Sequence, residues 1–274
     1  MLKNRVSNIV LMGQPESTQI WEQKVTKLFN TKKVIFVKEA SAIPDSANTC
    51  IYVPGVKTDI NQLLKLIKKG MHVLVVTHPV LLLDHAETLW KVAKEAGTEI
   101  WISLWNMFRP GIPQLMERLS KPDYLFFERF VHSGDNNESR LVKQVLCEEI
   151  LLALTWFGSD LKRISIRESG KSQLLHLETV SQQLLSLHVN WQLSIDKVYR
   201  SVGSNGSGRF LRRDDFAECS ISHEGQEIKL PVQPDHTPAD NLLIHFIRAI
   251  RGLAHTPSFK LYDLYRHRTI SDYI

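Results

Sequence analysis

The residues whose chemistry could define a site lie where apolar runs of the sequence end. Gly13 follows the run Asn8–Met12 and begins the stretch Gly13-Gln14-Pro15-Glu16-Ser17-Thr18, where a G-x-G-x-x-G loop would hold the diphosphate of a dinucleotide. Only the first glycine of that pattern is present. Pro15 offers no N–H to a phosphate, and Glu16 would place negative charge beside it. Both residues equally suit the first turn of a helix that binds nothing.

Two titratable side chains are candidates for proton transfer. His78 follows an apolar run, titrates near neutrality in its ordinary state, and would lie at the carboxyl end of a strand, where sites of α/β proteins form. The alternative interpretation is that His78 is a polar loop residue that precedes Pro79. Glu148 lies in an apolar-rich segment and could act as a base if burial raised its pKa. Its alternative is that Glu148 and Glu149 form the polar stripe of a helix.

Composition excludes several classes of protein. The chain has 274 residues, a formal net charge of +5, 43% hydrophobic residues and 23% charged residues, as in an ordinary globular protein. The basic residues form short, separate clusters, so no nucleic-acid arm is expected. Three distant cysteines, Cys50, Cys147 and Cys219, favour a reducing compartment over a disulfide framework. No His, Cys and carboxylate spacing indicates a metal site.

No apolar run is long enough for a membrane span, and the N-terminus lacks the apolar core of a signal peptide. We therefore expect no membrane association and a cytoplasmic location.

The elements that must position these residues alternate in the first half of the chain. Apolar runs predict five strands, and helical spacing or capping signals predict helices between most of them. The expected strands are Asn8–Met12, Lys33–Val37, Cys50–Val53, Met71–Val76 and Ile100–Leu104; the expected helices are Glu16–Phe29, one capped by Asp59 and ended by Gly70, Asp84–Ala96 and Ile112–Leu119. The link from Val37 to Cys50 contains Pro44 and predicts a loop with at most one turn. This alternation indicates a parallel sheet.

The second half has a different pattern, with one long helix followed by extended segments joined by short turns. Such neighbouring strands favour an antiparallel sheet. The expected helix is Arg140–Phe157; the expected strands are Arg163–Arg167, Leu174–Thr179, Leu184–Leu193, Lys197–Val202, Phe216–Ser222 and Gln226–Val232; two final helices follow, one capped by Asp240 and one near Tyr262–Tyr273. We predict an α/β fold: a shortened Rossmann-type domain over residues 1–122, then an α+β domain with an open, mainly antiparallel sheet over 123–274. The C-terminal helices could pack back on the first domain.

Four stretches carry a resemblance to a known family. Ile51-Tyr52-Val53-Pro54-Gly55 looks like a strand that ends in a small-residue–Pro turn, and Leu63–Val75 looks like a helix–Gly–strand run. Asn106-Met107-Phe108-Arg109-Pro110 and the end helix Phe246–Gly252 have counterparts in the same order. The chain thus resembles the Gfo/Idh/MocA oxidoreductases, the family of glucose–fructose oxidoreductase and inositol 2-dehydrogenase. The resemblance implies NAD(P), sugar or polyol substrates, and oligomers that pair through the open sheet.

The resemblance also implies roles for particular residues. Gly13, Glu39 and Pro54 would contact the cofactor, with Glu39 near the ribose. The family's E-K-P motif corresponds to Thr77-His78-Pro79, and its Asp/His helix pair corresponds to Gln144 and Glu148. Arg109 would orient the substrate.

Because the phosphate loop, the lysine and the helix pair all depart together, three functions remain open. The leading hypothesis is a diverged homologue without standard NAD(P)-linked hydride transfer and without a cofactor. It would bind a small, sugar-like ligand as a regulatory or partner subunit and form a homo-oligomer through the C-terminal sheet. The alternative is an active NAD(P)-dependent oxidoreductase that uses His78, Glu148 and Arg109. A third is an interaction protein that uses the open sheet face.

Overall fold

The structure is a computed structural model, and it describes most of the chain. The described residues are 9–29, 34–55, 58–109, 112–131, 138–191, 199–204, 210–214, 218–223, 226–229, 237–253 and 258–274. The chain divides into two compact units. Unit 1 consists of Met1–Trp105 and Pro238–Arg268, and unit 2 consists of Asn106–Thr237 and Thr269–Ile274. Residue 122, the boundary expected from the sequence, falls inside unit 2.

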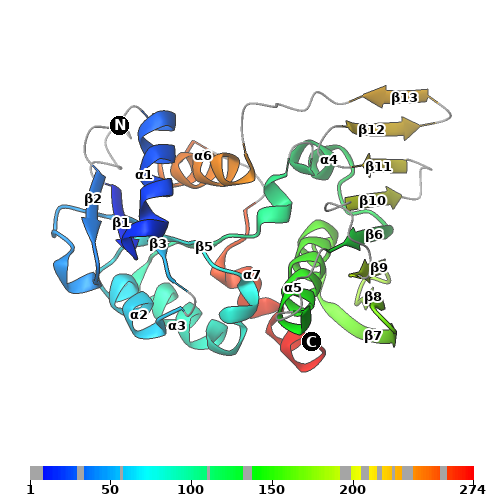
Figure 1. Ribbon diagram of the computed structural model, residues 1–274, viewed down its shortest axis with the longest axis horizontal. Coiled ribbons are helices and arrows are strands. Elements are labelled where there is room, and N and C mark those ends of the chain that lie inside the picture. Colours follow the sequence, from blue (N-terminus) through cyan, green and yellow to red (C-terminus); the bar gives the residue numbers. More distant parts are fainter. Residues whose placement is uncertain are drawn as a thin grey trace. The chain divides into compact units, whose positions relative to one another are not determined.

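Unit 1 is built on a five-stranded parallel sheet in the order β2-β1-β3-β4-β5 (Figure 1). Its strands are β1 (Ile9–Gly13), β2 (Val34–Val37), β3 (Thr49–Val53), β4 (His72–Val75) and β5 (Ile100–Ile102). The three middle strands, β1, β3 and β4, are almost entirely buried, which explains why they read as continuous apolar runs. The strand order changes direction between β1 and β3, and sites of such sheets form at the carboxyl ends beside this point.

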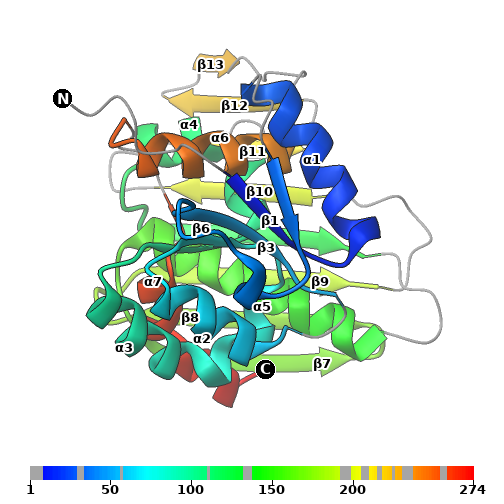
Figure 2. The same cartoon turned by 90° about the vertical axis from the view of Figure 1, so that its left-hand side faces the viewer.

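Helices cover both faces of this sheet. They are α1 (Pro15–Phe29), α2 (Ile60–Lys68), α3 (Ala86–Ala96), α6 (Pro238–Ile250) and α7 (Leu261–Arg266). Figures 1 and 2 show α1 and α6 on one face and α2 and α3 on the other, with α7 beside α3. Asp59 caps α2 as predicted, because its Oδ1 accepts hydrogen bonds from the backbone N–H groups of Asn61 and Gln62.

The connection from β2 to β3 has no α-helix, as the sequence predicted. It contains only the single 3-10 turn η1 (Ala40–Ala42), which the Gln62 side chain fastens by accepting a hydrogen bond from the Ala40 N–H at 2.9 Å. The other 3-10 helices are η2 (Pro79–Leu81), η3 (Leu83–His85), η4 (Trp105–Phe108) and η5 (Arg268–Asp272). Asp240 has a different role from the expected cap: α6 already begins at Pro238, and Asp240 pairs with Lys24 of α1 at 2.7 Å.

Unit 2 has an eight-stranded sheet in the order β13-β12-β11-β10-β6-β9-β8-β7. Its strands are β6 (Tyr124–Phe130), β7 (Leu161–Ser169), β8 (Ser172–Thr179), β9 (Leu184–Asn190), β10 (Tyr199–Ser204), β11 (Phe210–Asp214), β12 (Glu218–His223) and β13 (Gln226–Lys229); its helices are α4 (Ile112–Arg118) and α5 (Glu138–Phe157). All neighbouring pairs are antiparallel except β6 and β9, so the prediction of an open, mainly antiparallel sheet is confirmed.

The sequence missed β6 and β11. β6 is central: it pairs with β10 on one side and runs parallel to β9 on the other. Parallel neighbours need a long crossover, and α5, which lies between β6 and β9 in the sequence and packs on one face of the sheet, provides it (Figure 1). None of the helices in the described ranges combines the length and hydropathy that crossing a bilayer requires.

Candidate functional site

Gly13 ends β1 at the point where the sheet order reverses. It pairs in register with Val53 of β3, and its φ of +151° is a conformation that side chains disfavour. A Cβ added at Gly13 would lie 2.0 Å from the Val53 carbonyl oxygen. The glycine is therefore required by the close approach of β1 and β3. Its presence alone is not evidence of a phosphate contact.

The turn after Gly13 leads directly into α1. Pro15 is the first residue of the helix and Glu16 lies in its first turn. Thr18, at the position of the third glycine of the nucleotide loop, is buried. Its Oγ1 lies 3.0 Å from the carbonyl oxygens of both Gln14 and Pro15, so its hydroxyl hydrogen is directed back into the chain. The Thr18 side chain thus hydrogen-bonds to the backbone at the start of its own helix.

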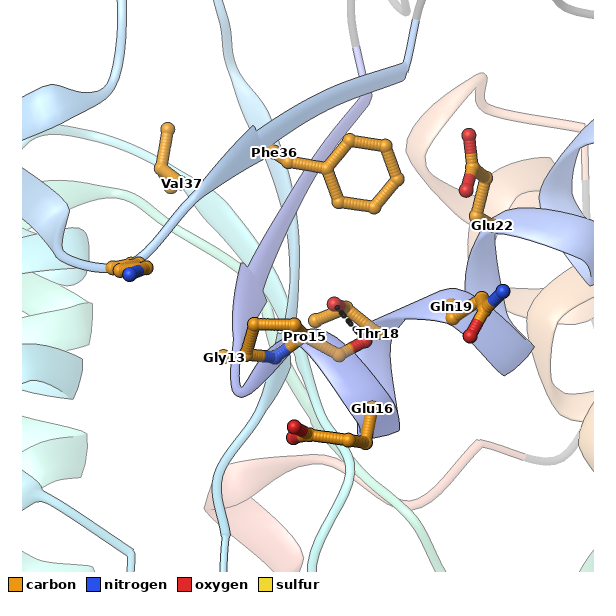
Figure 3. Close-up of a pocket in the computed structure, with 9 residues that line it drawn as sticks. Gly13, Pro15, Glu16, Thr18, Gln19, Glu22, Phe36 and Val37 are labelled. Carbon is orange, nitrogen blue, oxygen red and sulfur yellow. Dashed lines mark hydrogen bonds between the residues drawn. The ribbon is translucent and has the colours of Figure 1, made fainter.

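A cavity of about 520 Å³ opens beside this turn (Figure 3). Its lining comes from the end of β1, from α1 and from the end of β2: Gly13, Pro15, Glu16, Thr18, Gln19, Glu22, Phe36, Val37 and Lys38. The volume falls in the range of small-molecule pockets. We call this space the α1 cavity. Its position, at the carboxyl ends of β1 and β2, is where ligands of open α/β sheets bind.

The α1 cavity lacks the features by which a glycine-rich loop holds a diphosphate. Such a loop needs the second glycine of the G-x-G-x-x-G pattern so that its backbone can approach the diphosphate closely. It also needs N–H groups at the positive end of the helix to bind the phosphates. Pro15 has no N–H, and the Glu16 carboxylate lines the same space. The residues present therefore do not fit a diphosphate held in that manner.

The other two predicted cofactor residues, Glu39 and Pro54, are not among the residues that line the α1 cavity. Glu39 is exposed and precedes η1. Pro54 directly follows β3 and is half-buried. Nearby, Tyr52 anchors the start of α2: its hydroxyl accepts a hydrogen bond from the Asp59 N–H at 3.2 Å. Burial raises the pKa of Tyr52 to about 12, so this phenol stays protonated at neutral pH.

His78 lies just beyond the end of β4, on the same edge of the sheet as Gly13 and Pro54. It is half-buried and precedes η2, whose first residue is Pro79. The preceding residue, Thr77, is fixed on both sides. The Thr77 N–H donates to Ser103 Oγ at 2.9 Å, and Ser103 Oγ donates in turn to the Thr77 carbonyl at 2.7 Å. The Thr77 hydroxyl lies 3.1 Å from the Thr58 hydroxyl. The fold therefore holds His78 at a strand end. A catalytic role for His78 stays a prediction.

Arg109, Gln144 and Glu148 belong to unit 2, and all three are buried, with 7–8% of each residue exposed. Gln144 and Glu148 lie one turn apart on α5, as the family pair would. The structure thus keeps polar groups at these positions. The assignment of Glu148 as a base and Arg109 as a substrate-orienting group stays a prediction.

The polar-stripe interpretation of Glu148 and Glu149 is wrong, because both residues are buried, and Glu149 has no exposed surface at all. Arg129 of β6 donates from Nε to Glu149 Oε1 at 2.7 Å and from Nη2 to Glu149 Oε2 at 2.6 Å. Asn106 Nδ2 also donates to Glu149 Oε1. The sequence pattern did not predict this cluster. The residue that could have predicted this cluster is Arg129, an arginine inside the apolar run of β6. A charged side chain is almost never fully buried unless it is paired, so a buried Arg129 requires a partner.

Comparison with solved structures gives close matches over nearly the whole chain. A UDP-N-acetylglucosamine 3-dehydrogenase, GnnA, from Acidithiobacillus ferrooxidans matches with a TM-score of 0.81 at 14% identity, over 98% of this chain and 96% of that one. The dehydrogenase MviM from Clostridium difficile matches with a TM-score of 0.75 at 10% identity, over 97% of each chain. A dehydrogenase from Chromobacterium violaceum matches with a TM-score of 0.74 at 13% identity, over 98% and 94%.

The chain has the fold of these dehydrogenases. The fold expected from the Gfo/Idh/MocA resemblance is therefore confirmed. No family model matches the sequence, and no curated protein matches it. At identities of 10–14% the likeness shows the fold and does not transfer an activity. Within the described ranges, no three His, Cys, Asp or Glu side chains converge in a way that could hold a metal ion.

Proposed function

We propose that this chain is a ligand-binding protein on a dehydrogenase fold and that it does not carry out standard NAD(P)-linked hydride transfer. The observation that carries the proposal is the pair Pro15 and Glu16, which line the α1 cavity where a diphosphate would need N–H groups and positive potential. Thr18 supports it, because a buried side chain with internal hydrogen bonds replaces the third glycine. The protein would then act as a ligand-binding, regulatory or partner subunit.

Calorimetric titration with NADH and with NADPH tests this proposal. The purified chain is first checked by absorbance for nucleotide carried over from expression. We expect no heat of binding up to millimolar dinucleotide. Binding at micromolar concentration would overturn the proposal.

The second candidate is an NAD(P)-dependent oxidoreductase that acts on a sugar-like compound. It is favoured by the fold shared with UDP-N-acetylglucosamine 3-dehydrogenase and by the position of His78 at the carboxyl end of β4. In that case His78 would donate or accept the proton, and Glu148 and Arg109 would orient the substrate. Turnover of NAD(P)H with a panel of sugars and keto-sugars would establish this function. If turnover were unaffected by His78→Ala and by Glu148→Gln, neither residue would have a role in the reaction.

We also propose that two copies of the chain pair through the open face of the unit 2 sheet. Arg129 faces α5, so by strand alternation Tyr124, Phe126 and Glu128 face away from the helix. Leu184, which is opposite Tyr124 on β9, is 47% exposed. The apolar side chains of this face, Tyr124, Phe126 and Leu184, are suited to association with a second copy.

Light scattering on the purified chain tests this pairing. We expect a dimer or a larger oligomer, and Leu184→Lys should shift it toward the monomer. Val180→Lys is the matched control, because Val180 is 63% exposed but lies in the turn after β8. A native chain that is monomeric at all concentrations would overturn the proposal.

The cytoplasm is the compartment we propose. Cys50 and Cys147 are buried free thiols, and burial raises the pKa of both well above its usual range. Such side chains persist as thiols in a reducing compartment.

A further inference from the structure

Unit 2 contains a cavity of about 610 Å³ between the first half of α5 and the sheet that this helix covers (Figure 1). All of its lining residues belong to unit 2. Gln144 and Glu148 do not line it, because the helical period places them on the other side of α5. The lining residues of α5 are spaced three and four apart and share one face of the helix: Ser139, Val142, Lys143 and Leu146. We call this space the α5 cavity.

The sheet side of the α5 cavity presents two hydrogen-bond acceptors next to each other. Glu168 of β7 and Gln173 of β8 are paired in register, and Gln173 Nε2 donates to Glu168 Oε1. The other side-chain atom of this amide, Gln173 Oε1, is buried and accepts no hydrogen bond from the described residues. A buried oxygen without a donor costs free energy. A ligand that brings N–H or O–H groups to this side would remove that cost.

The helix side of the α5 cavity has the opposite charge and a buried apolar surface. Lys143 supplies an ammonium group, which acts only as a donor. Val142 and Leu146 are buried, with 5% and 3% of each residue exposed. Trp191, directly after β9, adds a half-buried aromatic ring, and its backbone N–H donates to the Lys171 carbonyl at 3.0 Å. The lining therefore combines a cation, an anion with a neighbouring acceptor, and apolar surface.

We propose that the α5 cavity binds a free amino acid with an apolar or aromatic side chain. The ammonium group of the ligand would donate to the Glu168 carboxylate and to Gln173 Oε1, which gains the donor that it lacks. The carboxylate of the ligand would accept from Lys143 Nζ. The ligand's side chain would pack against the apolar lining and Trp191. A volume of about 610 Å³ is within the range of small-molecule pockets.

The charges of the lining favour a zwitterion over a simple amine or a simple acid. Lys143 and Glu168 are the only charged side chains among the described lining residues. An amine alone would be attracted by Glu168 and repelled by Lys143, and a carboxylic acid alone would meet the reverse. The inference does not depend on the proposed function, because the α5 cavity and the α1 cavity share no residue.

Calorimetric titration of the full chain with related compounds tests this inference. L-Phenylalanine carries both charges, L-phenylalaninamide lacks the carboxylate, and 3-phenylpropanoate lacks the ammonium group. L-Leucine is a second zwitterion, with an aliphatic side chain. We expect L-phenylalanine or L-leucine to bind with a dissociation constant below about 1 mM, as suits ligands of this size. L-Phenylalaninamide and 3-phenylpropanoate should bind about fivefold to tenfold more weakly than L-phenylalanine, because each loses one charge-assisted contact.

Two variants assign the charges of the ligand to the two sides of the cavity. Glu168→Gln should weaken L-phenylalanine binding by about fivefold and should not weaken 3-phenylpropanoate binding, because that probe has no ammonium group. Lys143→Gln should weaken L-phenylalanine binding by a similar factor and should not weaken L-phenylalaninamide binding. Arg140→Gln is the matched control, because Arg140 is an exposed residue of α5 outside the cavity. It should weaken none of the three.

A third variant separates a binding role of Gln173 from a structural one. Gln173→Leu removes the buried oxygen that lacks a donor, so the unliganded chain should have a urea midpoint no lower than that of the native chain. L-Phenylalanine binding should still weaken by about fivefold or more, because the ammonium group loses an acceptor. A lower urea midpoint with unchanged affinity would assign Gln173 a structural role and contradict the inference.

Three further results would overturn the inference. One is that neither L-phenylalanine nor L-leucine binds at millimolar concentration. Another is that L-phenylalaninamide or 3-phenylpropanoate binds as tightly as L-phenylalanine, because a single charge would then be sufficient. The third is that affinity for L-phenylalanine is unchanged in both Glu168→Gln and Lys143→Gln, which would place the amino acid outside the α5 cavity. The NADH titration that tests the proposed function affects none of these outcomes.

Discussion

Arg129 and Glu149 form a doubly hydrogen-bonded ion pair inside unit 2, with 1% of the Arg129 side chain and none of the Glu149 side chain exposed. The Nε–Oε1 and Nη2–Oε2 distances are 2.7 and 2.6 Å. Asn106 of η4 donates to the same carboxylate, so one residue of α5 joins β6 and η4. Two charges removed from water are stable only while each is paired. The cluster therefore fixes how the long helix is placed on its sheet.

Removing one partner of this pair should be strongly destabilising. Glu149→Gln removes the doubly hydrogen-bonded negative charge beside the buried Arg129 guanidinium, and we expect the free energy of unfolding to fall by about 3–5 kcal/mol. Urea unfolding followed by circular dichroism measures this change.

Two further variants show whether the effect comes from an uncompensated charge. The double variant Arg129→Met/Glu149→Leu removes both charges and should recover most of the loss. Lys91→Met breaks an exposed pair with Glu87 on α3, and it should leave the urea midpoint almost unchanged. A Glu149→Gln protein as stable as the native chain would contradict a structural role for the pair.

Gly13 should be intolerant of any side chain for a backbone reason. Gly13→Ala would place a Cβ 2.0 Å from the Val53 carbonyl oxygen in a disfavoured backbone conformation. We expect about 2–4 kcal/mol of destabilisation in thermal or urea unfolding. Gly55→Ala is the matched control: its added Cβ would make only an ordinary contact, 3.7 Å from Gln14 Cγ. Equal stability of the two variants would show that β1 and β3 can separate at this point without cost.

The strands and helices of unit 1 were predictable because burial on both sheet faces leaves unambiguous apolar runs, as in β3. The missing helix between β2 and β3 was predictable from Pro44 and a short link. β6 was missed because Tyr124–Phe130 contains Glu128 and Arg129 in an otherwise apolar run, and nothing in the sequence shows that Arg129 finds a partner on α5. A pairing between residues 20 positions apart depends on the fold itself.

At the candidate site, the sequence correctly located the β1–α1 turn and the end of β4. It could not show why Gly13 is present, because the reason is the Val53 carbonyl on a strand 40 residues away in the chain. Phe36 was not singled out either. An aromatic residue in a short apolar run is usually core, and its 46% exposure follows from the position of β2 at the sheet edge.

Restoring the glycine-type loop should create affinity for a dinucleotide. The double variant Pro15→Gly/Glu16→Ser supplies the missing N–H and removes the carboxylate from the α1 cavity. We expect NADH binding to strengthen by about tenfold or more, because the positive end of α1 becomes available to an anion. Calorimetry measures the change, and Glu95→Gln is the charge control, because Glu95 is an exposed residue of α3 outside the cavity. Unchanged NADH affinity in a folded variant would mean that Thr18, or the shape of the cavity, is what prevents binding.

His245 of α6 should make unit 1 sensitive to acid. Burial, and secondarily the positive charge of Arg248, lower the pKa of His245 from its ordinary value of 6.5. As the pH falls through 6.5, the unfolded chain takes up a proton at His245 before the native chain does, so protonation favours unfolding. The free energy of unfolding should therefore fall between about pH 7.5 and 5.5, and His245→Gln should remove part of that fall. Urea unfolding across this range measures it, with His176→Gln on the exposed side of β8 as a control that keeps the native pH dependence. An identical pH slope in His245→Gln and the native chain would show that His245 does not contribute.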